Sequence, residues 1–136
     1  MDPKTSRFVE EMGLQFERDA YPRTAGRVFG LLRVSPEGRT IEDIADALML
    51  SRTSVGENVR LMERVGVLER IVKAGDRRDH FRVSADILTR LIAYRLGRLR
   101  QFREAFAGGL ATPEARDSVV KERISSICEV LDRAIE

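Results

Sequence analysis

Short hydroxyl side chains and arginines are the residues of this chain whose types and spacing suit a chemical task, and they gather between Ser51 and Arg78. Ser51 is a natural N-cap for a helix. The first turn of that helix then holds Arg52, Thr53 and Ser54. Hydroxyl groups and free backbone N–H groups at a helix N-terminus bind phosphate oxygens, and side chains just inside reach base edges. The pattern therefore indicates contact with DNA.

The middle of the same predicted helix carries longer polar side chains on its exposed face. Arg60 is long enough for a bidentate contact with guanine, and Glu57 can accept a hydrogen bond from N4 of cytosine. Gly56 lies at the margin of this face, while Val55 and Val59 point to the other side. The alternative for Arg60 and Glu57 is a solvated ion pair three residues apart.

A β-hairpin with a basic tip is predicted directly after this helix. Residues 67–73 are rich in β-branched side chains, residues 74–79 form a loop, and residues 80–83 return with Phe81 facing inward and His80 facing outward. An arginine on a thin hairpin can enter the minor groove of DNA. We therefore add Lys73, Arg77 and Arg78 to the predicted DNA-binding residues. The alternative is that the two arginines only pair with the neighbouring aspartates.

Helical segments surround this unit and must position it. A helix over residues 41–48 with Thr40 as N-cap precedes the recognition helix and completes a helix-turn-helix. The predicted fold is mainly α with a small β-hairpin wing, a winged helix-turn-helix with N- and C-terminal dimerisation helices. We assign residues 1–36 to N-terminal support helices, 37–84 to the DNA-binding unit and 85–136 to C-terminal dimerisation helices, within a single compact domain.

The N-terminal support is predicted as two helices, over residues 6–19 and 22–35, that approach closely at Gly26 and Gly30. Four aromatic residues raise the question of a small-molecule effector, and the candidate pocket contains Phe16, Tyr21, Phe29 and Tyr94. The alternative is that these rings only fill the core.

The C-terminal part is predicted as two amphipathic helices. The first runs over residues 85–107 with Ser84 as its cap, and the second starts at Thr112-Pro113. Because so little of the chain remains to cover their apolar stripes, we expect a homodimer.

Composition excludes several other classes. Charged residues make up 34% of the 136 residues and hydrophobic residues 43%, which is typical of a globular protein. No apolar run is long enough for a membrane span, so we expect a cytoplasmic protein without membrane contact. With one cysteine, one histidine and no glycine-rich phosphate loop, we expect neither an enzyme nor a metal site, and no cofactor.

The net charge of +2 is unevenly distributed. Residues 50–84 contain eight Lys or Arg and five Asp or Glu, which gives 8 − 5 = +3 for this segment. The positive excess thus lies on the predicted DNA-binding unit, as an electrostatic footprint on nucleic acid requires.

Residues 50–84 resemble the MarR-type winged-helix transcriptional regulators, through the element GDRRDHF at residues 75–81. The upstream stretch YPRTAGRVFG at residues 21–30 is similar to the GbsR branch, the regulators of glycine betaine synthesis and uptake. The resemblance implies a dimeric repressor that binds a pseudo-palindromic operator with its recognition helix in the major groove and its wing at the minor groove. In some members of that branch a small-molecule effector, choline, is sensed. The alternative function is a winged-helix module for protein–protein contact without DNA binding.

Overall fold

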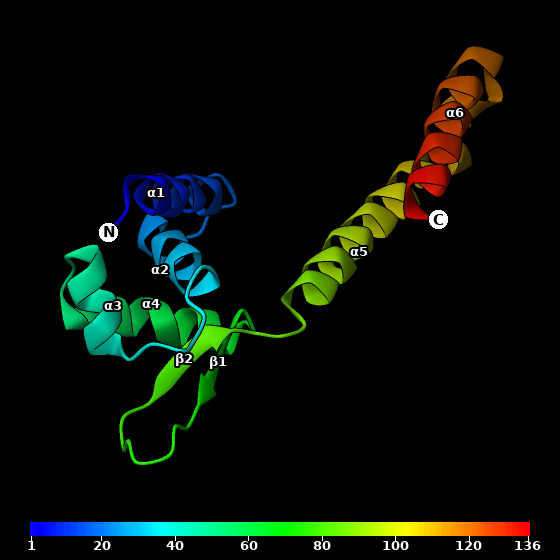
Figure 1. The fold of residues 1–136 in the computed structure, drawn as a ribbon. Helices are drawn as coiled ribbons and strands as arrows, with labels where there is room; N and C mark the ends of the chain where they lie inside the picture. Colours follow the sequence, from blue (N-terminus) through cyan, green and yellow to red (C-terminus); the bar gives the residue numbers. More distant parts are fainter. The chain divides into compact units, whose positions relative to one another are not determined.

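The computed structural model describes all 136 residues, which divide into two compact units, Met1–Ile87 and Leu88–Glu136. The first unit contains four helices and a two-stranded hairpin, and the second is helical (Figure 1). The predicted fold class, mainly α with a small β-hairpin wing, is confirmed. None of the helices combines the length and the apolar character that crossing a membrane requires.

Helices α1 (Pro3–Arg18) and α2 (Arg23–Arg33) form a tightly packed pair. Asp2 caps α1 by accepting a hydrogen bond from the Lys4 N–H at 2.8 Å, so the helix begins three residues earlier than predicted. Pro22 is the N-cap residue of α2 rather than its first residue. The close approach predicted at the two glycines is present, since a Cβ atom on Gly26 would lie 2.4 Å from the Met12 carbonyl oxygen.

Helices α3 (Ile41–Leu48) and α4 (Arg52–Arg64) form the predicted helix-turn-helix. Thr40 caps α3 reciprocally with Asp43: the Asp43 N–H donates to Thr40 Oγ1 and the Thr40 N–H donates to the Asp43 carboxylate. Ser51 caps α4 by accepting from the Ser54 N–H at 3.1 Å. One face of each helix is buried in the core of the first unit, through Ile44, Ala45, Leu48, Val55, Val59 and Met62. The opposite face of α4 is thereby left to solvent.

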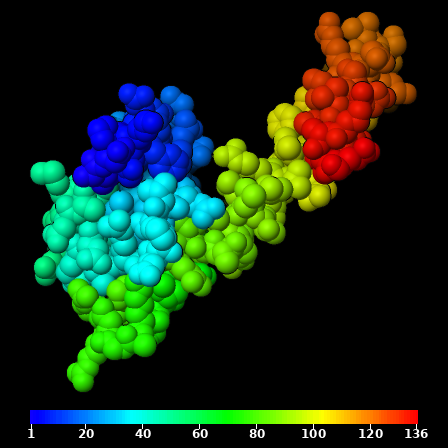
Figure 2. All heavy atoms as spheres, viewed as in Figure 1, coloured from blue at the N-terminus to red at the C-terminus, as the bar shows by residue number.

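The wing consists of β1 (Leu68–Ile71) and β2 (His80–Val83), paired antiparallel with Leu68 opposite Val83. Gly66, at φ +82°, ends the preceding helix. Phe81 is 2% exposed and also exchanges backbone hydrogen bonds of 3.0 and 2.8 Å with Arg39, so the turn before α3 joins the edge of the hairpin. The loop between the strands projects from the first unit as a narrow extension (Figure 2).

His80 is a correction to the sequence-based expectation. We predicted that this residue faces outward, but it is only 5% exposed. Its Nε2 atom lies 3.0 Å from the carboxylate of Asp76, while Nδ1 is buried without a hydrogen-bond partner. The strict alternation of inward and outward residues fails at the first position of β2, because the loop carries Asp76 back over the strand and covers the imidazole.

The second unit differs from the prediction in where its helices begin. Helix α5 spans Ile87–Ala107, two residues shorter at its start than expected. Thr112 and Pro113 do not open the last helix: Gly108–Ala111 and Pro113–Arg116 form two short 3-10 turns, η1 and η2. Helix α6 (Ser118–Ile135) begins after Asp117, whose carboxylate accepts from the N–H groups of Val119 at 2.8 Å and Val120 at 3.4 Å.

The cap of α6 gives a first testable prediction. We expect Asp117→Ala to lower the free energy of unfolding by about 1 kcal/mol, because two N–H groups of the first turn lose their acceptor. Thr112→Ala should cost less, since the Thr112 side chain makes no capping bond and donates only to the Gly109 carbonyl. Urea denaturation followed by circular dichroism measures both. Equal losses of unfolding free energy, or a larger loss in Thr112→Ala, would indicate that the last helix begins at Thr112-Pro113 and not after Asp117.

Candidate nucleic-acid interface

The exposed face of α4 presents cations that have no acidic partner within the chain. Arg52, Arg60 and Arg64 are exposed and make no ion pair, and Glu57 is exposed without one as well. The solvated Glu57–Arg60 pair considered from the sequence is therefore not formed. Instead the Arg60 guanidinium folds back over Gly56, where an added Cβ would lie 3.3 Å from Nη2. Gly56 itself is buried beneath it.

The hydroxyl groups at the start of α4 are arranged as predicted. Ser51 and Thr53 are exposed and Ser54 is half-buried. Asn58 bonds back to the Ser54 carbonyl at 2.8 Å and so fixes the first turn from within. The start of α4 thus presents the exposed side chains of Ser51 and Thr53 beside Arg52, which makes no ion pair.

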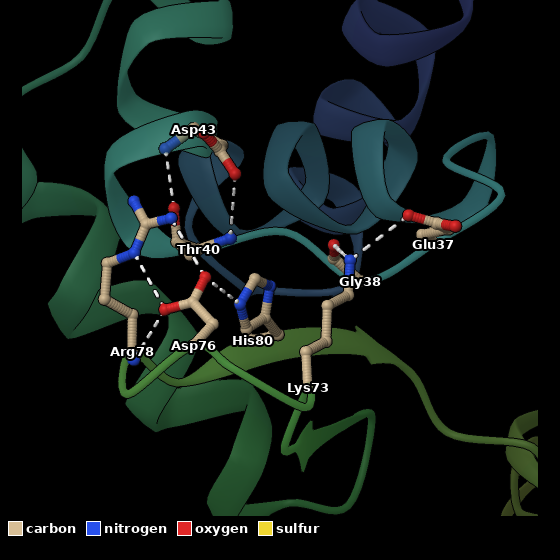
Figure 3. Close-up of polar contacts among 8 residues, drawn as sticks. All are labelled: Glu37, Gly38, Thr40, Asp43, Lys73, Asp76, Arg78 and His80. Atoms are coloured by element: carbon tan, nitrogen blue, oxygen red, sulfur yellow. Dashed lines mark hydrogen bonds and ion pairs between the residues drawn. The ribbon is translucent and has the colours of Figure 1, made fainter.

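The cations of the wing fall into two groups. Arg77, at the tip, is exposed and makes no ion pair. Arg78 pairs with Asp76 at 3.0 Å, which agrees with half of the alternative considered from the sequence. Lys73 donates to the Glu37 carboxylate at 3.3 Å and to the Gly38 carbonyl at 3.2 Å. Figure 3 shows both ties, one inside the loop and one from the wing to the turn before α3.

Asp76 is the acceptor that organises the loop. Hydrogen bonds from the Arg78 guanidinium, then from the Arg78 backbone N–H and from His80, hold the pKa of the Asp76 carboxyl well below its ordinary value. The same interaction raises the pKa of Arg78. The carboxylate of Asp43, whose pKa is lowered chiefly by the Thr40 N–H, also interacts electrostatically with Arg78 and raises the pKa of that arginine further (Figure 3).

The lowered pKa of Asp76 has a consequence for stability. A carboxyl group whose pKa is depressed by folding contributes stability that is fully present above its unfolded pKa and is lost as pH falls towards the folded value. We therefore expect the contribution of Asp76 to the thermal midpoint to be constant above about pH 4 and to decrease as the pH falls below that. The Asp76→Asn variant should have a lower midpoint at pH 6 and a flatter decline between pH 5 and 3. Parallel profiles for the two proteins would contradict this role.

The four aromatic residues of the predicted effector pocket are only partly brought together. Phe16 lies 5.2 Å from Phe29 and 5.9 Å from Tyr21 between ring centroids, and the two phenylalanines pack against the core. Tyr94 belongs to α5 in the second unit. Two hollows in the first unit, of about 550 and 610 Å³, are lined by other residues. These contacts favour the interpretation that Phe16 and Phe29 fill the core.

Comparison with known proteins agrees with this fold. A model of the MarR family matches residues 21–79, which contain the helix-turn-helix and most of the wing. The crystal structure of a transcriptional regulator superimposes with a TM-score of 0.62 at 30% sequence identity, covering 98% of this chain and 96% of that one. The chain belongs to the MarR family. It is thus a member of a family of winged-helix transcriptional regulators.

Two further similarities place this MarR-family chain among its relatives. The HTH-type transcriptional regulator MmpR5 of Mycobacterium tuberculosis (strain ATCC 25618 / H37Rv) is 41% identical over 83 residues, which cover 60% of this chain and 50% of that protein. The chain thus spans about half the length of the curated relatives it matches. A mutant of S. aureus MepR bound to an oligodeoxyribonucleotide has a TM-score of 0.50 at 20% identity over 94% of this chain and 90% of that one, a likeness of fold alone.

Sequence reasoning missed one functional candidate in the wing. Arg70 in β1 was counted only as part of the positive charge, yet it contacts residues of α4 and of the loop. No local signal distinguishes it, because its partners lie seven and nine residues away in different elements.

Proposed function

We propose that the chain is a sequence-specific DNA-binding regulator, a repressor, that binds a pseudo-palindromic operator as a homodimer. Helix α4 enters the major groove, and the wing reaches the minor groove with Arg77 and Arg78. The observation that carries the proposal is the set of arginines without acidic partners at the exposed face of α4 and at the wing tip. Cations left without internal partners neutralise phosphates at low cost.

The homodimer is supported by the apolar surface of α5. None of its 21 residues is buried, although the helix carries a stripe of large apolar side chains. Leu88 is 66% exposed and Phe102 56%. A second copy that covers these side chains is the economical solution, and it sets two recognition helices at a fixed spacing. Light scattering at micromolar concentration tests this, and a monomer would overturn it.

DNA binding is tested by titrating labelled genomic fragments at several salt concentrations. We expect a steep negative slope of log K against log [salt], with a specific mode above a non-specific background. Arg60→Ala should weaken the specific mode more than the non-specific one, because a base contact carries sequence information. Absence of binding at about 50 mM salt to all fragments would reject the proposal, since non-specific electrostatic binding is strongest at low salt.

The finer assignment to the GbsR-like branch is part of the same proposal, with control by a small-molecule effector. The stretch that supports the branch contains the two glycines of the α1–α2 contact. Tyr21 is 43% exposed beside Phe16 and offers an aromatic face to a quaternary ammonium ligand. Thermal-shift measurements with choline and glycine betaine test this. A rise that disappears in Tyr21→Ala supports the effector, and a flat response with both removes it from the proposal.

A further inference from the structure

Arg70 lies on the face of the hairpin that is turned towards the core and α4. It stands opposite Phe81 in the register of the two strands, and directly opposite residues share a face of a β-ladder. Phe81 is a core residue, and the guanidinium carbon of Arg70 lies 5.3 Å from the centroid of its ring. The strand register and the contact with the Phe81 ring therefore position the Arg70 side chain independently of its ion pairs.

The guanidinium group joins three separate elements. Nε and Nη2 donate to the two carboxylate oxygens of Glu63 on α4, each at 3.1 Å. Nη1 donates to the carboxylate of Asp79, the last residue of the wing loop, at 2.9 Å. Glu63, and after it Asp79, raise the pKa of Arg70. One side chain thus connects the recognition helix, the first strand and the loop that carries the basic tip.

The geometry distinguishes this contact from an ordinary surface ion pair. A single exposed pair holds its partners weakly, because two flexible side chains must be ordered in water. Here the planar fork binds one carboxylate at two points and a second carboxylate with its remaining edge, which fixes direction as well as distance. Asp79 is two residues from Arg77, so its position limits where the tip can point.

We propose that Arg70 is a positioning residue for DNA recognition, which holds the wing tip at a fixed place relative to α4 through Glu63 and Asp79. The inference rests on the proposed DNA-binding function. It adds a structural requirement to that function, since a protein that contacts the major groove with α4 and the minor groove with its wing needs a fixed distance between these two elements. Arg70 acts through other residues and does not itself bind phosphate.

Arg82 provides a matched control within the same hairpin. It pairs with Glu69, the residue opposite to it in the ladder, at 2.5 Å, on the other face of the two strands. Its side chain is 55% exposed and that of Arg70 46%. Arg82→Met therefore removes the same charge and a strand-to-strand pair, but leaves α4 and the loop connected.

The first measurement follows amide hydrogen exchange in the free protein. In Arg70→Met we expect residues 72–80 to exchange about tenfold faster than in the wild type, while α1 and α2 keep their protection and show that the unit is folded. Arg82→Met should leave these rates unchanged. Arg70→Lys should fall between the two, because an ammonium group cannot hold both carboxylates as a fork.

The second measurement is DNA affinity as a function of salt. We expect Arg70→Met to bind genomic fragments about tenfold more weakly than Arg82→Met, with the same slope of log K against log [salt]. Equal affinities of the two variants would overturn the proposal. A slope lower by about 0.9 in Arg70→Met would overturn it too, since that change means that Arg70 itself neutralises a phosphate.

The two arms separate this inference from the function on which it rests. If the wild-type protein binds no DNA, the proposed function fails, and hydrogen exchange still decides whether Arg70 holds the wing. If the wild type binds DNA but exchange in residues 72–80 is the same in Arg70→Met as in Arg82→Met, the function stands and the positioning role of Arg70 is rejected.

Discussion

Alanine at both Arg77 and Arg78 is expected to weaken the binding of DNA by this chain about a hundredfold or more. Each arginine bound to a base edge or phosphate is worth about 1–3 kcal/mol, and the proposed homodimer would present the wing twice. The slope of log K against log [salt] should fall by about 0.9 for each phosphate that the variant no longer neutralises. Fluorescence anisotropy on a labelled fragment at several salt concentrations measures both quantities.

Arg18→Ala is the control for this experiment. Arg18 is an exposed arginine in the last turn of α1, without an ion pair, and it lies outside the helix-turn-helix and the wing. Its removal lowers the net charge without touching the proposed interface, so affinity should change by less than about threefold. If the double variant of the wing behaves like Arg18→Ala, the wing does not contact DNA and the protein–protein module becomes the better interpretation.

The single substitutions separate the two arginines, because the free protein holds them differently. Arg77 makes no ion pair in the free protein and can bind DNA without breaking one. Arg78 pairs with Asp76, so it must either break this ion pair to bind a phosphate or remain bound within the loop. We therefore expect Arg77→Ala to change affinity and salt slope together. Arg78→Ala should also alter the wing of the free protein, which is visible in the amide resonances of residues 76–80.

The second large effect concerns the N-terminal helices α1 and α2, which support the predicted DNA-binding unit. Gly26→Ala is expected to lower the free energy of unfolding by about 3 kcal/mol. The added methyl group would meet the Met12 carbonyl oxygen at 2.4 Å and the Gly13 Cα at 2.7 Å. Both are backbone atoms, so no side chain can turn away, and α1 must separate from α2. Urea denaturation at one fixed protein concentration measures the loss, since the proposed dimerisation would make stability depend on concentration.

Gly97→Ala is the matched control for this substitution. It is also a helical glycine, in α5, but an added Cβ meets no atom within 4 Å. Alanine is the better helix former by about 1 kcal/mol, so stability should stay the same or rise. A loss at Gly26 no larger than about 0.5 kcal/mol would show that the two helices do not approach as closely as the glycine pattern implies.

Much of the fold can be predicted from the sequence because its signals are local. The caps at Asp2, Thr40 and Ser51 each bond to an N–H only two or three residues further on, and Gly66 adopts the positive φ that ends α4. A local signal misleads where two candidates compete. Thr112-Pro113 has the expected form of a helix start, yet it begins only the short 3-10 turn Pro113–Arg116, and Asp117 caps α6.

In the candidate site, too, the features with a local sequence signal could be predicted, and those that depend on distant residues could not. The exposed face of α4 follows from helical periodicity, so the sequence by itself determined that Arg52, Arg60 and the hydroxyl groups share a surface. Which cations of the wing stay free was decided only by the tertiary structure. Lys73 finds Glu37, 36 residues away, and Arg70 finds Glu63 across an element boundary. A long charged side chain pairs with whichever carboxylate the tertiary structure brings within its reach. These partners lie at irregular distances along the chain, so no periodic sequence pattern predicts them.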